Sequence, residues 1–293
     1  MDFVRPSTWA DALAAKAEQP TAVPIAGGTD LMVELNFDHR RPPALLDLGA
    51  IPELAEWSMT DGRVRIGATV PYTRIITELG DKLPGLAMAS RTVGSPQIRN
   101  RGTVGGNLGT ASPAGDAHPA LLASDAVVEV ASVRGTRMVP VAQFYVGVKR
   151  NALATDELIA AVHIAPAEGP QQFAKVGTRN AMVIAVCAFG LSLFPATGRV
   201  GAAIGSAAPT PRHATDAEEF IAGELGSLWD GPRKPLPDNV IRRFGELVGT
   251  AASPIDDVRG TAAYRTHALA VLARRTLAWA WQEYVEGSWP ACA

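Results

Sequence analysis

Two glycine pairs constrain the fold of this chain more than any other feature of its sequence. The first pair lies in Ala26-Gly27-Gly28-Thr29-Asp30, and the second lies in Thr103-Val104-Gly105-Gly106-Asn107. Because glycine has no Cβ, the backbone at such a turn can approach an anion closely, and several N–H groups can converge on it. A single pair is usually an ordinary tight turn, but two pairs, each beside a threonine hydroxyl, favour a diphosphate held from both sides.

The common nucleotide-binding fingerprints are missing from the sequence. It contains no GxxxxGK[ST] loop of the ATPase type. It also contains no well-placed GxGxxG followed by an acidic residue about 20 positions later, which a Rossmann nicotinamide site requires. The glycine pairs therefore indicate a dinucleotide-binding fold of another kind.

Composition excludes several classes of function. The 293 residues are 47% apolar and 19% charged, which is typical of a chain that folds around a core. Lys and Arg (27) nearly balance Asp and Glu (29), and the net charge of -2 argues against a nucleic-acid binder. Cys187 and Cys292 are too few and too far apart to ligate an iron–sulfur cluster or a cysteine zinc site, and the five histidines show no metal-ligand spacing.

We expect neither a secretory signal nor a membrane span. The first residues lack a basic patch followed by an apolar core, and no apolar run reaches about 18 residues. These patterns predict a cytoplasmic protein.

Hydrophobic patterns divide the chain into modules of mixed helix and strand. A compact β-α-β-like piece with a helix beginning at Trp9 comes first, and a module of strands and helices then runs to a linker at residues 166–170. Beyond this linker, strands at 173–176, 182–194 and 200–204 precede a long helix. Strands followed by helices predict an α+β protein rather than a regularly alternating parallel sheet.

The last helix is predicted to pack one face on a sheet. Tyr264, Ala268 and Leu272 are spaced four apart, and Trp279 follows Leu272 by one heptad. We therefore expect these four side chains to face the core and Trp281 to lie on the helix surface.

Both glycine segments resemble the FAD-binding (medium) subunit of the molybdenum hydroxylases, a family that includes the flavin subunits of xanthine dehydrogenase and carbon monoxide dehydrogenase. The resemblance is carried by residues 24–31 and 102–116, and matches at 97–100, 175–181 and 207–211 extend it. It runs over nearly the whole chain, and the second glycine segment is its most specific part.

The resemblance implies a fold and its boundaries. We expect a two-subdomain FAD-binding fold of the vanillyl-alcohol-oxidase/PCMH type, followed by an α+β C-terminal domain in which helices pack on an antiparallel sheet. The FAD-binding domain would span residues 1–168, with subdomains of about 1–55 and 56–168. The C-terminal flavoprotein domain would span residues 169–293.

The resemblance also implies which residues hold the cofactor. Asp116 would accept hydrogen bonds from ribityl or ribose hydroxyls, Lys175 would approach the isoalloxazine, and Ile159 would pack against that ring. No catalytic residue and no metal ligand is implied on this chain, and we expect His118 at the surface or at a helix start. The pyrophosphate would lie between Pro24, Ile25, Ala26, Gly27, Gly28, Thr29, Asp30 and Leu31 on one side and Thr103, Val104, Gly105, Gly106 and Asn107 on the other.

In function, the resemblance implies an FAD-carrying electron-transfer subunit of a multi-subunit molybdenum hydroxylase. A large partner subunit would oxidise the substrate at its molybdopterin cofactor, and a small partner subunit would pass electrons through [2Fe–2S] clusters to FAD on this chain. FAD would then reduce an external acceptor, and the complex would be a dimer of heterotrimers. Xanthine-like purines, other N-heterocycles, aldehydes and carbon monoxide all stay open as substrates.

Two other functions stay open at this point. A self-sufficient flavin oxidase of the same FAD-binding fold would need its own substrate cavity and often a residue linked covalently to the flavin. A scaffold protein that has lost flavin would not need two intact glycine segments. Flavin absorbance of the purified protein separates the scaffold from the two enzymes, and co-purification of iron and molybdenum subunits separates those two.

Overall fold

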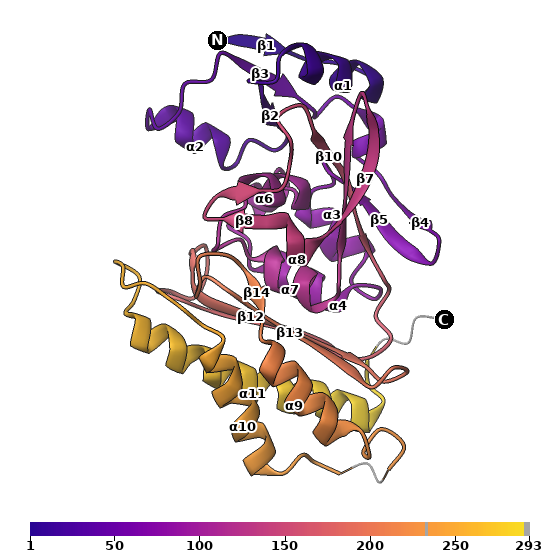
Figure 1. Cartoon of the computed structure of the whole chain (residues 1–293), viewed down its shortest axis with the longest axis vertical. Helices are drawn as coiled ribbons and strands as arrows, with labels where there is room; N and C mark the ends of the chain where they lie inside the picture. The colour runs from indigo at the N-terminus through magenta and orange to yellow at the C-terminus, as the bar shows by residue number, and fades with distance from the viewer. Residues whose placement is uncertain (232–233, 290–293) are drawn as a thin grey trace.

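The computed structural model describes residues 1–231 and 234–289 of the chain. Figure 1 shows three tiers, which we call the N-terminal tier (residues 1–55), the middle tier (56–164) and the C-terminal tier (171–286). Sheets of three, five and four strands form their centres. Mixed helix and sheet throughout confirms the expected α+β class.

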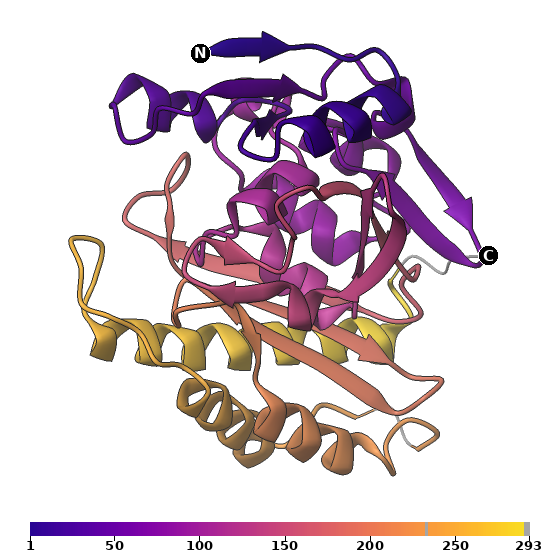
Figure 2. The same cartoon turned by 45° about the horizontal axis from the view of Figure 1, so that its top comes forward.

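The N-terminal tier is a small parallel sheet with two helices, and it lies over the middle tier (Figure 2). Its first helix begins as expected, because the Thr8 side chain accepts a hydrogen bond from the Asp11 backbone N–H at 3.1 Å. The sheet has the order β1-β3-β2. The elements are β1 (Asp2–Val4), α1 (Trp9–Glu18), β2 (Val23–Ile25), α2 (Leu31–Asn36), β3 (Ala44–Asp47) and the 3-10 helix η1 (Pro52–Leu54).

The middle tier is an antiparallel sheet of order β4-β5-β10-β6-β7, with short helices packed on it. A second, two-stranded sheet joins β8 to β9. The strands are β4 (Trp57–Thr60), β5 (Arg63–Gly67), β6 (Val127–Ser132), β7 (Gly135–Pro140), β8 (Tyr145–Gly147), β9 (Arg150–Asn151) and β10 (Leu158–Ile164). The helices are α3 (Tyr72–Glu78), α4 (Pro84–Arg91), α5 (Pro96–Arg99), α6 (Val104–Thr110), α7 (Ala117–Ala123) and α8 (Val141–Phe144).

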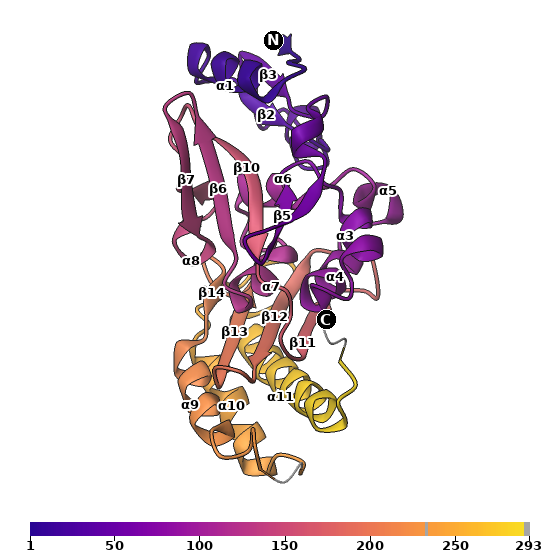
Figure 3. The ribbon, with the colours of Figure 1, turned by 90° about the vertical axis from the view of Figure 1, so that its right-hand side faces the viewer.

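The C-terminal tier is an antiparallel meander with helices on both faces, as expected of this domain. Helices α9 and α11 cover one face and α10 packs against both of them, whereas α4 and α7 of the middle tier pack on the other face (Figure 3). Strand β12 is accordingly buried along almost its whole length. The elements are β11 (Gln171–Gly177), β12 (Ala185–Phe194), β13 (Arg199–Gly205), β14 (Arg212–His213), α9 (Thr215–Leu225), α10 (Asp238–Thr250) and α11 (Ala262–Glu286).

The predicted face of α11 is largely wrong. Tyr264 and Trp279 are 49% and 47% exposed, whereas Trp281 is 2% exposed and donates a hydrogen bond from Nε1 to the backbone oxygen of Lys234 at 2.7 Å. Only Ala268 of the expected stripe is fully buried. Two aromatic residues spaced at i and i+2 lie on different helix faces. Trp281 is the buried one, and its ring packs edge-on against Trp229, with 5.6 Å between the ring centroids.

Cys187 is a free, fully buried thiol of β12, and burial raises its pKa to about 12. Cys292 lies outside the described residues. Within residues 1–231 and 234–289, no helix is long and apolar enough to cross a membrane. The same residues include no group of three or more His, Cys, Asp or Glu side chains that could hold a metal ion.

Candidate cofactor site

The first glycine segment packs directly on the backbone that leads into the second. A Cβ at Gly27 would lie 1.8 Å from the carbonyl oxygen of Arg101 and 2.4 Å from its carbon. Gly28 has a φ of +75°, a conformation that residues with a Cβ rarely adopt. Gly27 therefore lets the segment between β2 and α2 lie against the segment before α6, and Gly28 supplies the turn before α2.

The second glycine segment forms the start of α6. The Thr103 hydroxyl accepts a hydrogen bond from the Gly106 N–H at 2.9 Å and caps the helix. A Cβ at Gly105 would lie 2.5 Å from the carbonyl oxygen of Ala68, so Gly105 is required for packing. At Gly106 the nearest atom to such a Cβ is Thr103 Oγ1 at 3.1 Å, and this position faces a cleft.

The cleft has two lobes that meet at the glycine segments. The larger lobe has a volume of about 550 Å³ and the smaller about 320 Å³, both within the usual range for ligand pockets. Because the lobes share a wall, a ligand that fills both must pass between the two glycine segments. The shared wall consists of Pro24, Ala26, Asp30, Leu31, Gly106 and Thr110.

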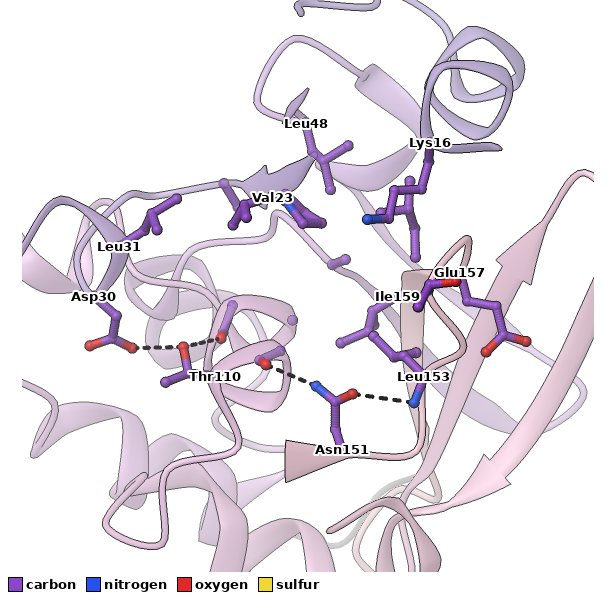
Figure 4. A pocket seen from close by; sticks show the side chains of 18 of the residues that line it. Lys16, Val23, Asp30, Leu31, Leu48, Thr110, Asn151, Leu153, Glu157 and Ile159 are labelled. Atoms are coloured by element: carbon purple, nitrogen blue, oxygen red, sulfur yellow. Dashed lines mark hydrogen bonds between the residues drawn. The ribbon is translucent and has the colours of Figure 1, made fainter. Parts of the chain in front are cut away.

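The larger lobe lies between the N-terminal and middle tiers (Figure 4). Apolar walls come from Val23 and Leu48 on one side and from Ile159 on the other. Lys16 reaches in from α1, and its Nζ donates hydrogen bonds to the backbone oxygens of Pro20 and Ala22, both at 2.7 Å. Burial is the main cause that lowers the pKa of Lys16.

A polar rim closes the larger lobe near the glycine segments. The Thr110 hydroxyl donates to Asp30 Oδ2 at 3.1 Å, which joins α6 to the N-terminal tier (Figure 4). Asn151 Nδ2 donates to the backbone oxygen of Gly109 at 2.9 Å and thereby ties β9 to α6. The Thr110–Asp30 hydrogen bond thus adds a side-chain contact between the two subdomains to the backbone packing at Gly27.

The smaller lobe contains buried polar atoms that need a ligand. Among the described residues, Tyr72 OH, Asn107 Oδ1 and Asp116 Oδ1 are buried without a hydrogen-bond partner, and all three residues line this lobe. Buried polar atoms in folded proteins are nearly always paired, because an unpaired one loses its hydration without compensation. Two carbonyl-type acceptors and a phenol therefore point to a ligand that carries hydroxyl and N–H groups.

Asp116 and Lys175 form a buried ion pair at the base of the smaller lobe. Lys175 Nζ donates to Asp116 Oδ2 at 2.6 Å, and each side chain is 10% exposed. Burial raises the pKa of Asp116, and the charge of Lys175 opposes that rise. Asp116 occupies the N-cap position of α7, but its side chain makes no capping hydrogen bond to the helix.

His118 lies at a helix start, one of the two expected placements, because it is the second residue of α7. It is completely buried and not at the surface, and its Nδ1 is 2.8 Å from the hydroxyl of Tyr145. Burial lowers the pKa of His118 to about 3, so the ring is neutral at physiological pH. A Cβ at Gly115 would lie 2.3 Å from His118 Nε2 and 2.7 Å from Asn107 Oδ1, so the ring packs directly behind the smaller lobe.

Most of the predicted site residues line the cleft, and two do not. Val104 is 1% exposed and belongs to the middle-tier core, and Lys175 lies behind Asp116 rather than in the wall. Ile159 lines the larger lobe, whereas Asp116 lines the smaller one, so Ile159 and Lys175 lie at different lobes. The predicted residues in the walls are Pro24, Ile25, Ala26, Gly27, Gly28, Thr29, Asp30, Leu31, Thr103, Gly105, Gly106, Asn107, Asp116 and Ile159.

Several wall residues escaped the sequence analysis because no motif surrounds them. Tyr72 follows a proline at the start of α3, and nothing in the sequence marks it as a wall residue. Burial is the main cause that raises the pKa of its hydroxyl well above the usual value, and the charge of Asp116 adds to the rise. Val93 and residues 182–184 come from loops without a recognisable pattern. Lys16 of α1 also lies in no motif.

The residues present fit FAD. Two lobes joined at a glycine-lined junction match a dinucleotide whose two halves flank a diphosphate. Gly106 leaves space at that junction, and the unpartnered oxygens of Asn107 and Asp116 match the hydroxyl donors of a sugar or ribityl chain.

Family models match most of the chain. The FAD binding domain in molybdopterin dehydrogenase matches residues 1–167, and the CO dehydrogenase flavoprotein C-terminal domain matches residues 172–280. The nicotinate dehydrogenase FAD-subunit of Eubacterium barkeri is 35% identical over 239 residues, which cover 76% of this chain and 79% of that protein. The putative xanthine dehydrogenase FAD-binding subunit of Escherichia coli (strain K12) is 30% identical over 286 residues, 94% of each chain.

Solved structures agree with these matches. A chain of carbon monoxide dehydrogenase from Hydrogenophaga pseudoflava superposes with a TM-score of 0.87 at 25% identity, covering 96% of this chain and 98% of that one. A chain of quinoline 2-oxidoreductase from Pseudomonas putida 86 shares the fold with a TM-score of 0.88 at 24% identity, and the match covers 97% of this chain and 98% of that one. The chain therefore belongs to the FAD-binding (medium) subunits of the molybdenum hydroxylases, a family of oxidoreductases.

Proposed function

We propose that this chain binds FAD across both lobes of the cleft, with the diphosphate between the two glycine segments. The observation that carries this proposal is the position of Gly106, which lies in the wall of both lobes and whose missing side chain leaves the junction open. Backbone N–H groups of the two glycine segments would donate to the diphosphate there, except that of Gly106, which the Thr103 hydroxyl accepts.

The flavin half is proposed to occupy the smaller lobe and the adenosine half the larger lobe. The unpartnered oxygens of Asn107 and Asp116 support this orientation, because a ribityl chain offers several hydroxyl donors to them. The apolar walls of the larger lobe, including Leu48 and Ile159, suit a flat purine. In this orientation Ile159 packs on the adenosine half and not on the isoalloxazine.

Each part of the site then has a separate task. FAD, when bound, accepts electrons singly or in pairs, which links one-electron clusters to a two-electron acceptor. Asp116 orients the cofactor through its free oxygen, while Gly27 and Gly28 bring the two subdomains close enough to enclose the diphosphate. Met182 and Ile184, 55% and 52% exposed at the edge of the smaller lobe, leave that edge open to a protein partner.

The domain boundaries follow the tiers. We propose an FAD-binding domain at residues 1–168, divided into subdomains of about 1–55 and 56–168, and a C-terminal flavoprotein domain at 169–293. A cluster of buried apolar residues confined to residues 187–281 supports the C-terminal division, and a cluster formed mainly by residues 12–54 supports the N-terminal one.

As a medium subunit, the chain works with an iron–sulfur subunit and a molybdopterin subunit. We further propose a dimer of such heterotrimers in the cytoplasm, with an external electron acceptor. Relatives are named for nicotinate, xanthine and carbon monoxide dehydrogenases. The proposed substrate is accordingly a xanthine-like or other aromatic heterocycle, an aldehyde or carbon monoxide, oxidised on the large subunit.

The decisive experiment compares the FAD-loaded isolated chain with the assembled complex under anaerobic conditions. Xanthine, nicotinate, an aldehyde and carbon monoxide are each added, and bleaching of the flavin absorbance is followed. We expect no bleaching of the isolated chain by any of the four, although dithionite bleaches it, and bleaching of the complex by its own substrate. An isolated chain that is bleached by one of these compounds would instead be a self-sufficient flavin oxidase.

A further inference from the structure

Lys175 contacts three separate walls of the smaller lobe without lining the lobe itself. Its Nζ donates to Asp116 Oδ2 at 2.6 Å, to the backbone oxygen of Thr92 at 2.9 Å and to the backbone oxygen of Val183 at 3.2 Å. These acceptors lie at the start of α7, at the end of α4 and in the loop before β12. An ammonium group has three donors, so Lys175 has none left for a ligand.

The partner of Lys175 is the group that faces the lobe. Asp116 lines the smaller lobe and uses Oδ2 for the lysine, while its buried Oδ1 has no partner within the described part of the chain. The other two acceptors of Lys175 also adjoin the smaller lobe: Thr92 precedes the wall residue Val93, and Val183 itself lines the wall. The lysine therefore fixes both the rotamer of Asp116 and the spacing of the walls around it.

We propose that Lys175 is a positioning residue for FAD, acting through Asp116 and not by contact with the isoalloxazine. This inference rests on the FAD site proposed above and replaces the role that the family resemblance suggested for this lysine. A buried carboxylate without a cation would lose its charge or turn away, and its free oxygen would no longer accept a strong hydrogen bond from the cofactor.

A double-mutant cycle on FAD affinity tests this coupling. The full chain is stripped of flavin, and FAD is titrated into wild type, Lys175→Met, Asp116→Asn and the double variant. We expect Lys175→Met to weaken FAD binding about ten- to a hundredfold, as loss of a hydrogen bond to a charged group does. In the Asp116→Asn background the same replacement should change affinity clearly less than in wild type, because only the anchoring of the carbonyls of Thr92 and Val183 is then lost.

The reduction potential of the bound FAD gives a second, independent readout. A cation in contact with the ring favours the reduced flavin, so its removal would lower the potential. Positioning through Asp116 predicts the same potential in Lys175→Met as in wild type. A lowered potential, or an equal loss of affinity in both backgrounds, would overturn the proposal in favour of direct contact or general destabilisation.

Controls keep the outcomes distinct. Lys82→Met removes a lysine of the middle tier that lines neither lobe, and it should leave FAD affinity unchanged. If Lys175→Met does not fold, Lys175→Gln retains donors for the carbonyls of Thr92 and Val183, and the same cycle is run with it. Failure of the wild-type chain to bind FAD would refute the proposed function itself. If the wild type binds FAD but Lys175→Met has the same effect in both backgrounds, only this role of Lys175 is refuted.

Discussion

Replacing Gly106 by alanine should weaken FAD binding while leaving the apo fold intact. The new methyl group would enter the junction of the two lobes, where we place the diphosphate. Its nearest protein neighbour would be Thr103 Oγ1 at 3.1 Å, a contact that needs a shift of only a few tenths of an ångström. Alanine within α6 gains up to about 1 kcal/mol of helix propensity over glycine, which offsets this contact.

The loss in affinity can be given a magnitude. Displacing the diphosphate from one charged hydrogen bond costs roughly 1.5–3 kcal/mol, and each 1.4 kcal/mol is tenfold in affinity. The dissociation constant for FAD should therefore rise about ten- to a hundredfold in Gly106→Ala, with little change in the apo melting temperature.

Flavin fluorescence quenching during titration of the apo protein measures the affinity, and a thermal melt without FAD measures the fold. Gly223→Ala is the matched control, because Gly223 lies in α9, has no atom within 4 Å of its built Cβ and lines neither lobe. It should leave FAD affinity unchanged. Wild-type affinity in Gly106→Ala would refute the placement of the diphosphate at this junction.

Three further predictions concern the fold and its response to pH. Gly27→Ala should lower the apo melting temperature by several degrees, since its Cβ would overlap the backbone of the second glycine segment; an unchanged melt would contradict that packing. Trp281→Ala should cost about 3–5 kcal/mol of unfolding free energy in chemical denaturation, whereas Trp279→Ala should cost far less, and equal losses would refute the observed helix face. A hydrogen bond from His213 to Glu218 raises the pKa of His213, so its stabilisation is complete below about pH 6.5 and is lost as pH rises through the raised pKa. The stability gap between wild type and His213→Gln should narrow with rising pH, and a gap independent of pH would contradict this.

Most walls of the candidate cofactor site could be predicted because their residues lie in short, local patterns. Gly27, Gly28, Gly106 and Asp116 all lie in the two glycine segments and line the cleft as expected. Close backbone approach is a property of the glycine itself, so it can be inferred without knowing the neighbour. The identity of that neighbour, such as the carbonyl of Arg101 for Gly27, required the structure.

The features that the sequence did not reveal depend on distant partners. Lys175 was expected at the flavin ring, and its hydrogen bond to Asp116, 59 residues earlier in the chain, follows no local pattern. His118 is buried because Tyr145, from β8, covers it. Trp281 of α11 is buried by Trp229 and by the backbone of Lys234, in a region between α9 and α10, two helices that the sequence analysis did not identify.

The flavin content of the isolated chain tests the central claim most directly. The purified chain is reconstituted with excess FAD, separated from free flavin by gel filtration, and its absorbance in the flavin and protein bands gives the stoichiometry. The two-lobed cleft predicts one FAD per chain. A folded chain, verified by its thermal melt, that elutes without flavin would contradict the assignment of this cleft as the FAD site.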